Sequence, residues 1–139
     1  MVSIRPADKS DLSNLVALDK KAHAEKRWWS AQGRRYFIKL MRRRGLLFVA
    51  EEHGSLVGYV SGDVQAVKGK RRVSLENLFV ERGYRKKKIA KRLVNSFISA
   101  WTGKGIKEMI LFCPPQLEGF YNRFGFKLTV IRMKRRLTA

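Results

Sequence analysis

The stretch Leu78-Phe79-Val80-Glu81-Arg82-Gly83-Tyr84-Arg85-Lys86-Lys87-Lys88-Ile89-Ala90-Lys91-Arg92-Leu93 joins three patterns in one continuous run. It starts as an apolar strand, passes through the cations of Arg85–Lys88, and continues as a helix. Apolar residues at helical spacing extend that helix over about residues 87–101: Ile89, Leu93, Val94, Phe97, Ile98 and Trp101. Four consecutive cations therefore stand at the predicted start of this helix.

Strands and helices alternate on the N-terminal side of this run. We expect a strand at Ile4–Ala7, then a helix capped by Asp8 with Asp11 as its acidic partner. The apolar face of a second helix is formed by Tyr36, Phe37, Leu40 and Met41. Two strands, Leu46–Glu51 and Leu56–Gly62, are predicted to join through a tight turn at His53-Gly54. A basic connection, Gln65–Arg72, is then expected to lead into a strand at Val73–Val80.

The C-terminal side continues the alternation. Met109–Phe112 is uniformly apolar, as expected for a buried central strand, and Pro114-Pro115 ends it. Gln116–Arg123 fits a short helix, and Phe126–Leu137 is predicted to supply one or two final strands. The fold class is therefore α/β (α+β), with a mixed, mostly antiparallel central sheet and helices on both faces.

Composition indicates one globular domain over residues 1–139 and an anionic partner. The chain is 45% hydrophobic, which is enough for a core. Lys and Arg total 31 against 11 Asp and Glu, so the formal net charge is +20. Self-repulsion at this charge opposes compaction unless an anion binds, and nucleic acid is the commonest such partner of basic proteins.

Two motifs resemble the GNAT superfamily of N-acetyltransferases. Residues 78–93 are similar to the family pattern L-x-V-x-P-x-Y-R-G-K-G-I-G-K-x-L, and residues 119–126 are similar to its F-Y-x-x-x-G-F signature. Arg132–Leu137 looks like the last strand of that family, and the Leu46–Tyr59 hairpin also matches. The resemblance covers nearly the whole chain and implies the GNAT fold with acetyl-CoA as the acetyl donor.

The resemblance also implies where acetyl-CoA would bind, with one departure. The pyrophosphate loop Q/R-x-x-G-x-G/A falls on residues 85–90, but Lys86 and Lys88 replace glycines. Either the lysine side chains hold the phosphates, or the site has closed and the lysines bind a polymer backbone. The backbone of the preceding strand is implied to bind the pantetheine arm. The implied cofactor-binding residues are Leu78, Phe79, Val80, Arg85, Lys86, Lys87, Lys88, Ile89 and Ala90.

Two residues are candidates for acid–base chemistry. Tyr121 occupies the position of the family's general acid, which protonates the leaving thiolate; the alternative is an aromatic that only packs against the long helix, and the surrounding motif favours the acid role in an enzyme. Glu76 lies on the strand before the basic run and could act as a general base, or it could be a solvated carboxylate that pairs with one of many cations. Strand alternation is expected to put Ser74, Glu76 and Leu78 on one face, and Leu75, Asn77 and Phe79 on the other. Further departures are Pro114 and Leu117, which stand where many members have Asn and Ala.

A rival hypothesis is a catalytically impaired GNAT-like protein that binds RNA, for example on the ribosome. Its evidence is the net charge and the lysines in place of glycines. The candidate contacts are Arg42, Arg43, Arg44, Lys68, Lys70, Arg71, Arg72, Arg85, Lys86, Lys87, Lys88, Lys134, Arg135 and Arg136. A third possibility combines the two functions. The amine acceptor is not identified by the sequence.

Several other kinds of function are not indicated. His23 and His53 have no metal-ligand spacing, so no metal site is expected. Cys113 is the single cysteine, which excludes an internal disulfide. No apolar run approaches the roughly 20 residues of a membrane-spanning helix, and the N-terminus has no apolar signal region. We therefore expect a cytoplasmic protein without a membrane partner.

Overall fold

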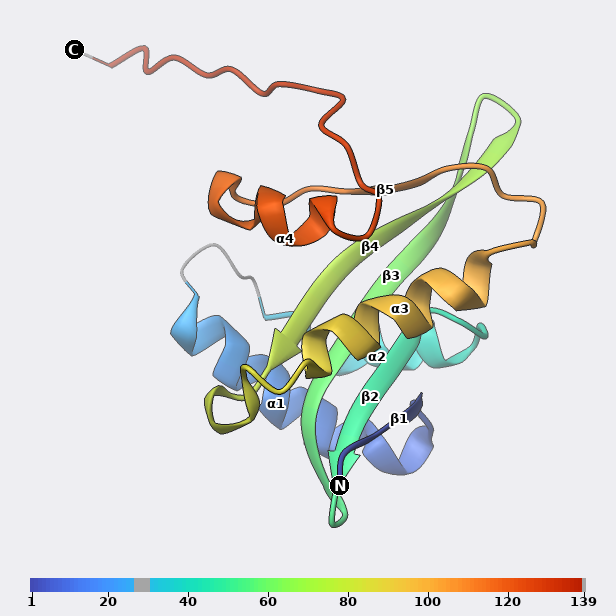
Figure 1. Ribbon diagram of the computed structural model, residues 1–139, viewed down its shortest axis with the longest axis vertical. Helices are drawn as coiled ribbons and strands as arrows, with labels where there is room; N and C mark the ends of the chain where they lie inside the picture. Colours follow the sequence, from blue (N-terminus) through green and yellow to red (C-terminus); the bar gives the residue numbers. More distant parts are fainter. Residues whose placement is uncertain (27–30, 139) are drawn as a thin grey trace.

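A computed structural model describes residues 1–26 and 31–138 and shows a five-stranded sheet (Figure 1). The strands follow the chain order across the sheet: β1 (Ser3–Pro6), β2 (Leu47–Glu52), β3 (Ser55–Val67), β4 (Lys70–Val80) and β5 (Met109–Leu111). Neighbouring strands are antiparallel from β1 to β4, whereas β4 and β5 are parallel. The predicted mixed, mostly antiparallel sheet is confirmed.

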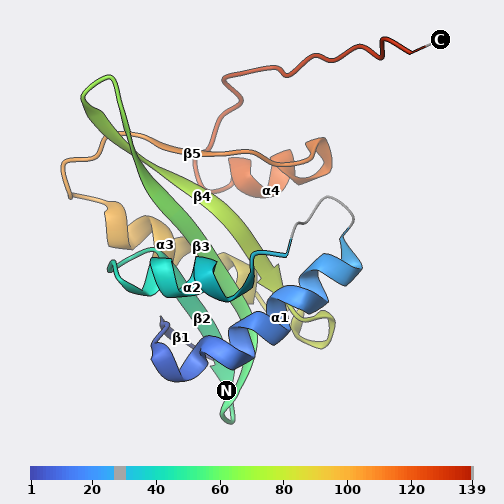
Figure 2. The same ribbon diagram turned by 180° about the vertical axis from the view of Figure 1, so that it is seen from behind.

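Helices cover both faces of this sheet, as the sequence predicted. Helices α1 (Leu12–Glu25) and α2 (Gly33–Met41) lie on one face, and α3 (Ile89–Trp101) lies on the other (Figures 1 and 2). Each face has its own apolar cluster: Phe37 of α2 packs with Tyr59 of β3 on one face, while Phe97 of α3 packs with Val60 of β3 on the other. The short helix α4 (Glu118–Asn122) joins the α3 cluster through Tyr121. Trp28 and Trp29 lie outside the described residues.

Two local predictions in the N-terminal half of the chain are confirmed: the cap at Asp8 and the turn at His53-Gly54. Asp8 caps the turn that precedes α1, because its Oδ1 accepts from the Ser10 N–H at 2.9 Å. The Asp8 N–H in turn donates to Asp11 Oδ2 at 2.9 Å, which completes a capping box. The β2–β3 hairpin turns at His53 and Gly54, whose φ angles are +51° and +79°.

The predicted basic connection at Gln65–Arg72 is wrong. Strands β3 and β4 continue through this segment, with Gln65 opposite Arg72 and Val67 opposite Lys70. Only Lys68 and Gly69, both with positive φ, form the turn. The β3–β4 hairpin therefore projects well beyond the rest of the sheet (Figure 1). The sequence did not indicate these strand ends, because the end of β3 at Ala66 and Val67 is exposed and β4 begins with the basic residues Lys70, Arg71 and Arg72.

A β-bulge in β4 overturns the predicted alternation of side chains. Ser61 pairs with Asn77 and Gly62 pairs with Leu75, so Glu76 is an extra residue on β4. Glu76 and Asn77 consequently both reach Tyr36 on the α2 face, whereas Leu78 packs in the α3 cluster. Gly62 makes the bulge possible, because a Cβ there would lie 2.1 Å from the Ser74 carbonyl oxygen and 2.3 Å from Phe97 Cζ.

Strands β4 and β5 separate after a short pairing. The partners run only from Val73 with Met109 to Leu75 with Leu111, so the rest of β4 has no described neighbour on that side. The expectation that Met109–Phe112 is a buried central strand is therefore wrong. Strand β5 is an edge strand, and Phe112, which follows it, is 87% exposed.

The predicted final strands at Phe126–Leu137 are also wrong. The chain turns at Gly125, where φ is +92°, and residues 126–138 form no helix or strand. This segment, termed the tail, runs clear of the folded body in both views (Figures 1 and 2). Phe126 still packs against Tyr121, but the large apolar side chains from Leu128 onward are exposed, which leaves the end of the sheet at β5 uncovered.

Candidate functional site

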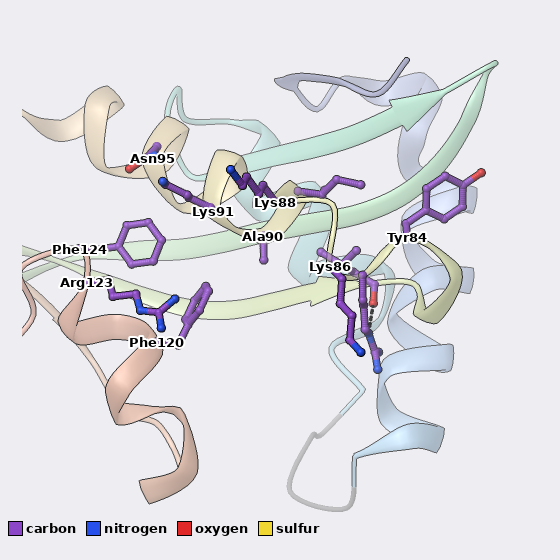
Figure 3. A pocket seen from close by; sticks show the side chains of 12 residues that line it. Tyr84, Lys86, Lys88, Ala90, Lys91, Asn95, Phe120, Arg123 and Phe124 are labelled. Atoms are coloured by element: carbon purple, nitrogen blue, oxygen red, sulfur yellow. Dashed lines mark hydrogen bonds between the residues drawn. The ribbon is translucent and has the colours of Figure 1, made fainter.

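A basic pocket of about 650 Å³ lies where the loop 81–88 meets the start of α3, with α4 on its other side. Phe120, Arg123 and Phe124 reach from the α4 region toward the side of α3 that carries Ala90, Lys91 and Asn95 (Figure 3). The pocket is lined by Val80, Tyr84, Arg85, Lys86, Lys88, Ile89, Ala90, Lys91, Asn95, Phe120, Arg123 and Phe124. Five of these side chains are cationic, and none is acidic, so the pocket fits an anionic ligand with an apolar part.

The two lysines that replace glycines keep a backbone conformation that glycine adopts easily. Lys86 has φ +64° and Lys88 has φ +63°, both in the left-handed region. For a residue with a Cβ this conformation costs about 1–2 kcal/mol. Such strain persists where the surrounding structure requires it, and it is concentrated at ligand sites. Residues 86 and 88 therefore have the backbone shape that glycine adopts most easily, although both are lysines.

The loop ends at the N-terminus of α3. Lys88 is the N-cap residue, and its side chain makes no capping hydrogen bond with the first turn of the helix. The first N–H groups of a helix lack partners within it and carry a partial positive charge. They add to the charge of Lys86, Lys88 and Lys91 at one end of the pocket.

Arg85 anchors this loop to the body of the protein. Its Nη1 and Nη2 donate to the two carboxylate oxygens of Glu25 on α1, at 2.5 and 2.7 Å, and its Nε donates to the Val80 carbonyl oxygen at 2.9 Å. This bidentate pairing lowers the pKa of Glu25 and raises that of Arg85. Arg85 lines the pocket, but its charge is already shared with Glu25.

The other predicted cofactor-binding residues do not all lie at the pocket. Lys87 does not line the pocket; its ammonium lies 5.4 Å from the centre of the Tyr84 ring. Phe79 is buried on the opposite face, beneath α1 and α2. Glu81 N–H donates to Val57 on β3, so by strand alternation the N–H groups of Leu78 and Val80 face the gap between β4 and β5.

A polar cluster surrounds Glu76 on the α2 face. The Tyr36 hydroxyl lies 2.7 Å from Ser61 Oγ, donates to Glu76 Oε1 at 3.3 Å, and accepts from Asn77 Nδ2 at 3.0 Å. Glu76 remains exposed, yet partial desolvation raises its pKa, and the negative charge of Asp63 raises it further. A carboxyl with a raised pKa is better suited to accept and release protons near neutral pH.

Glu76 and Asp63 are unusual among the acidic residues of this basic chain. Seven of the nine other acidic residues are in salt bridges: Asp8, Asp11, Glu25, Glu51, Glu52, Glu81 and Glu108. Within residues 1–26 and 31–138, neither Glu76 nor Asp63 forms a salt bridge. Ser74 lies opposite Asp63 in the β3–β4 pairing, and its buried hydroxyl has no hydrogen-bond partner in that part of the chain. Two negative charges are thus available beside the bulge.

Tyr121 is buried next to the pocket without lining it. Its side chain is only 8% exposed and packs in the α3 cluster with Val80 and Ile89. The rings of Phe120 and Phe126 lie edge-on to it, at 5.0 and 6.0 Å. Burial, and to a smaller extent the neighbouring Cys113, raises the pKa of Tyr121 to about 12. The phenol therefore stays protonated at neutral pH, as a proton donor must.

Comparison with known proteins identifies the family. The sequence matches the acetyltransferase (GNAT) family over residues 10–126. The chain belongs to the GNAT acetyltransferase family. No significant match is found among curated proteins.

Solved structures share the GNAT fold at low sequence identity. Glucosamine-6-phosphate N-acetyltransferase from Arabidopsis thaliana matches with a TM-score of 0.79 and 18% identity over 99% of both chains. A predicted acetyltransferase with acetyl-CoA from Clostridium acetobutylicum matches with a TM-score of 0.78 and 20% identity, over 99% of this chain and 97% of that one. An acetyltransferase of Trypanosoma brucei matches with a TM-score of 0.75 and 23% identity, over 99% of this chain and 100% of that one.

Sequence reasoning missed part of this GNAT site. Lys91 and Asn95 line the pocket three and seven residues after Lys88, a helical spacing that could have identified them. Arg123 comes from the α4 region, and no local pattern links it to α3. Asp63 and Ser61 were missed because only the bulge brings them beside Glu76.

The residues proposed for nucleic acid are spread over separate elements. Arg42–Arg44 follow α2, Lys68–Arg72 lie at the tip of the β3–β4 hairpin, Arg85–Lys88 precede α3, and Lys134–Arg136 lie in the tail. No comparison bears on RNA binding by this GNAT chain, which stays a prediction. For residues 1–26 and 31–138, no group of acidic, His and Cys residues is placed to hold a metal, and no helix is long and apolar enough to cross a membrane.

Proposed function

We propose that this protein transfers an acetyl group from acetyl-CoA to a cationic amine. The observation that carries the proposal is the left-handed backbone of Lys86 and Lys88 in a pocket lined by cations. This shape is the one that lets phosphate groups approach backbone N–H groups closely. Its retention, at an energetic cost, supports phosphate binding and argues against a loop that has lost its ligand.

The residues present fit acetyl-CoA. Lys86, Lys88 and the start of α3 would hold the diphosphate, and Lys91 and Arg123 supply further charge for the remaining phosphate. The N–H groups of Leu78 and Val80, in the gap beside β5, would bind the amide-bearing arm. When bound, acetyl-CoA supplies the acetyl group as a reactive thioester.

The residues on the other side of β4 suit the acceptor. An amine is protonated in water at neutral pH, and Asp63 and Glu76 attract such a cation to the bulge. It must lose a proton before it can attack, and Glu76 is the base that we assign to this step. Tyr36 and Asn77 hold the carboxylate in place.

Tyr121 is the acid that we assign to the departing thiolate. Its raised pKa keeps the proton available over the whole neutral range, and the thiolate of the departing group takes it. Its burial beside Val80 and Ile89 excludes water from this side of the gap.

Calorimetry with acetyl-CoA tests the proposal, followed by a thiol-release assay over a panel of amines. We expect a dissociation constant between about 1 μM and 1 mM, the usual range for enzyme substrates. Acetyl-pantetheine lacks the phosphates, and we expect it to bind roughly 100-fold more weakly because it loses charged hydrogen bonds. No binding of acetyl-CoA at millimolar concentration would overturn the proposed function.

A further inference from the structure

The hairpin of β3 and β4 extends beyond the strands that support it on either side. Strand β2 pairs with β3 as far as Ser61, and β5 pairs with β4 only from Val73 onward. Beyond these points, residues 65–67 and 70–72 pair with each other, and residues 66–71 are exposed. The tip of the hairpin stands clear of the helices in both views (Figures 1 and 2). Because an isolated two-stranded ribbon gains little stability from its own pairing, packing does not explain this extension.

Positive charge is concentrated at the tip of this hairpin. Residues 65–72 contain no acidic residue and four cations: Lys68, Lys70, Arg71 and Arg72. Arg72 pairs with Glu108 at 3.9 Å, whereas the other three form no salt bridge with the residues that the structure describes. Neighbouring like charges repel each other, and this repulsion is relieved when an anion binds between them. The tip therefore favours an anionic partner.

The geometry of the turn does not require these cations. The β2–β3 hairpin turns at His53-Gly54 with φ angles of +51° and +79°, and the β3–β4 hairpin turns at Lys68-Gly69 with φ angles of +51° and +77°. The two turns therefore share one shape, yet Glu51 and Glu52 precede the first and Lys70–Arg72 follow the second. Asn and Gly adopt the first position of such a turn with less strain than Lys does. A strained lysine at an exposed tip indicates a function for its charge.

We propose that the β3–β4 hairpin docks into a groove of a double-stranded nucleic acid, where its cations bind phosphates on both walls. Successive side chains of a strand point to opposite faces. Lys70 and Arg72 therefore leave one face of the ribbon and Arg71 leaves the other, with Lys68 at the tip. Cations on both faces suit a groove between two phosphate backbones better than they suit a flat anionic surface. The major groove of B-form DNA, about 12 Å wide, admits a two-stranded ribbon.

The other basic groups of the chain fit this role less well. Arg42–Arg44 follow the last turn of α2, where cations stabilise the free carbonyl groups of the helix. Lys134–Arg136 lie in the tail, which has no helix or strand to fix their spacing. Lys86 and Lys88 line the pocket that we assign to acetyl-CoA. The cations of residues 68–72 stand on a ribbon that is already paired, so less conformational freedom is lost on binding.

Binding of the full chain to labelled duplexes of about 20 base pairs, roughly two helical turns, tests the proposal over a series of salt concentrations. We expect the dissociation constant to rise steeply with salt, because each neutralised phosphate releases about 0.9 of a counterion. The triple variant Lys68→Gln/Lys70→Gln/Arg71→Gln should weaken binding by about 30-fold or more and lower the salt slope by about 2 to 3. The matched variant Arg42→Gln/Arg43→Gln/Arg44→Gln removes the same charge from another surface and should weaken binding by less than about fivefold.

Two further measurements make the result specific. Duplex DNA and duplex RNA of the same sequence identify the groove: tighter binding of DNA indicates the wide major groove, and tighter binding of RNA indicates the shallow minor groove. Acetyl-CoA affinity and circular dichroism of the hairpin variant should be unchanged, because residues 65–72 do not line the pocket, so a loss of duplex binding does not bear on acetyl transfer. Equal losses in the two triple variants, no duplex binding at about 50 mM salt, or tighter hairpin-dependent binding to phosphatidylserine vesicles would each overturn the proposal.

Discussion

The two sides of the sheet at the middle of β4 carry opposite charge. On the α3 side, the pocket collects Arg85, Lys86, Lys88, Lys91 and Arg123 around the start of α3. On the α2 side, Glu76 and Asp63 stand beside the bulge, and the structure gives neither a salt bridge within its described residues. The basic and the acidic surface lie on opposite sides of the same strand, β4.

This difference shows that the fold places basic and acidic side chains on different sides of β4. The chain has 31 basic and 11 acidic residues, yet Glu76 forms no salt bridge within the described residues, although the charge of Lys39 acts on it. The bulge instead turns Glu76 toward Tyr36 and away from the lysines of the loop. A phosphate-bearing donor and a cationic acceptor are thereby attracted to opposite sides of β4 and meet at the gap beside it.

The largest effect is expected when the base on the acidic side of β4 is removed. Glu76→Gln keeps the shape but cannot accept a proton, so we expect turnover to fall by about 10²–10⁴-fold. Acetyl-CoA affinity should stay within about twofold, because the substitution lies on the other side of the strand.

Glu108→Gln is the matched control, since Glu108 is an exposed carboxylate that pairs only loosely with Arg72, at 3.9 Å. It should leave turnover unchanged. Normal turnover in Glu76→Gln would remove Glu76 from the mechanism and leave it as a structural part of the bulge.

The second prediction concerns the proton donor on the α3 side. Tyr121→Phe should lower turnover by about 10²-fold while acetyl-CoA affinity is kept. Because the pKa of Tyr121 is raised to about 12, the wild-type rate should show no alkaline decline from this group at any pH below about 11. Thermal unfolding of the variant separates lost chemistry from lost packing, and full turnover in a folded variant would assign Tyr121 to packing alone.

The third prediction separates the charge of Lys88 from its backbone conformation. Lys88→Ala and Lys88→Gly both remove the ammonium, so both should weaken acetyl-CoA binding about tenfold. Only glycine relieves the strain of the left-handed backbone at residue 88. The free energy of unfolding of Lys88→Gly should therefore be about 1 kcal/mol larger than that of Lys88→Ala. Calorimetry and urea unfolding measure the two effects. Tighter binding by Lys88→Gly would mean that Lys88 blocks the pocket.

The smallest effect is a change in pH dependence on the acidic side. The charge of Asp63 raises the pKa of Glu76, while Lys39 lowers it. Asp63→Asn removes the raising charge, so the pKa of Glu76 falls and the base stays ionised to lower pH. The acidic limb of the kcat/KM profile should therefore move toward lower pH. A limb that stays in place, or moves upward, would show that Glu76 does not set it.

Much of the fold was predictable because the signals are local. The capping box of Asp8 and Asp11, the turn at His53-Gly54 and the apolar stripe of α3 follow from neighbouring residues. The cations of the loop made it recognisable in the sequence. The left-handed backbone of Lys86 and Lys88 was not predicted, because the spacing of residue types gives no information on φ. The bulge at Glu76 was missed because it depends on Gly62 of the partner strand.

The C-terminal tail was mispredicted for a different physical reason. Its apolar residues indicate a strand, but a strand needs a partner, and the sequence does not say which molecule supplies it. Tyr121 was placed in a helix beside the pocket by its motif, whereas its burial and its distance from the pocket lining depend on packing by Phe120 and Phe126.

Amide chemical shifts measured by NMR during two separate titrations test the central claim most directly. Acetyl-CoA should shift the amides of residues 86–91 and of Leu78 and Val80, while a simple diamine should shift those of Asp63, Glu76 and Asn77. Overlap of the two sets on the loop before α3, or a response to acetyl-CoA centred on Asp63, would contradict the division of β4 into a donor side and an acceptor side.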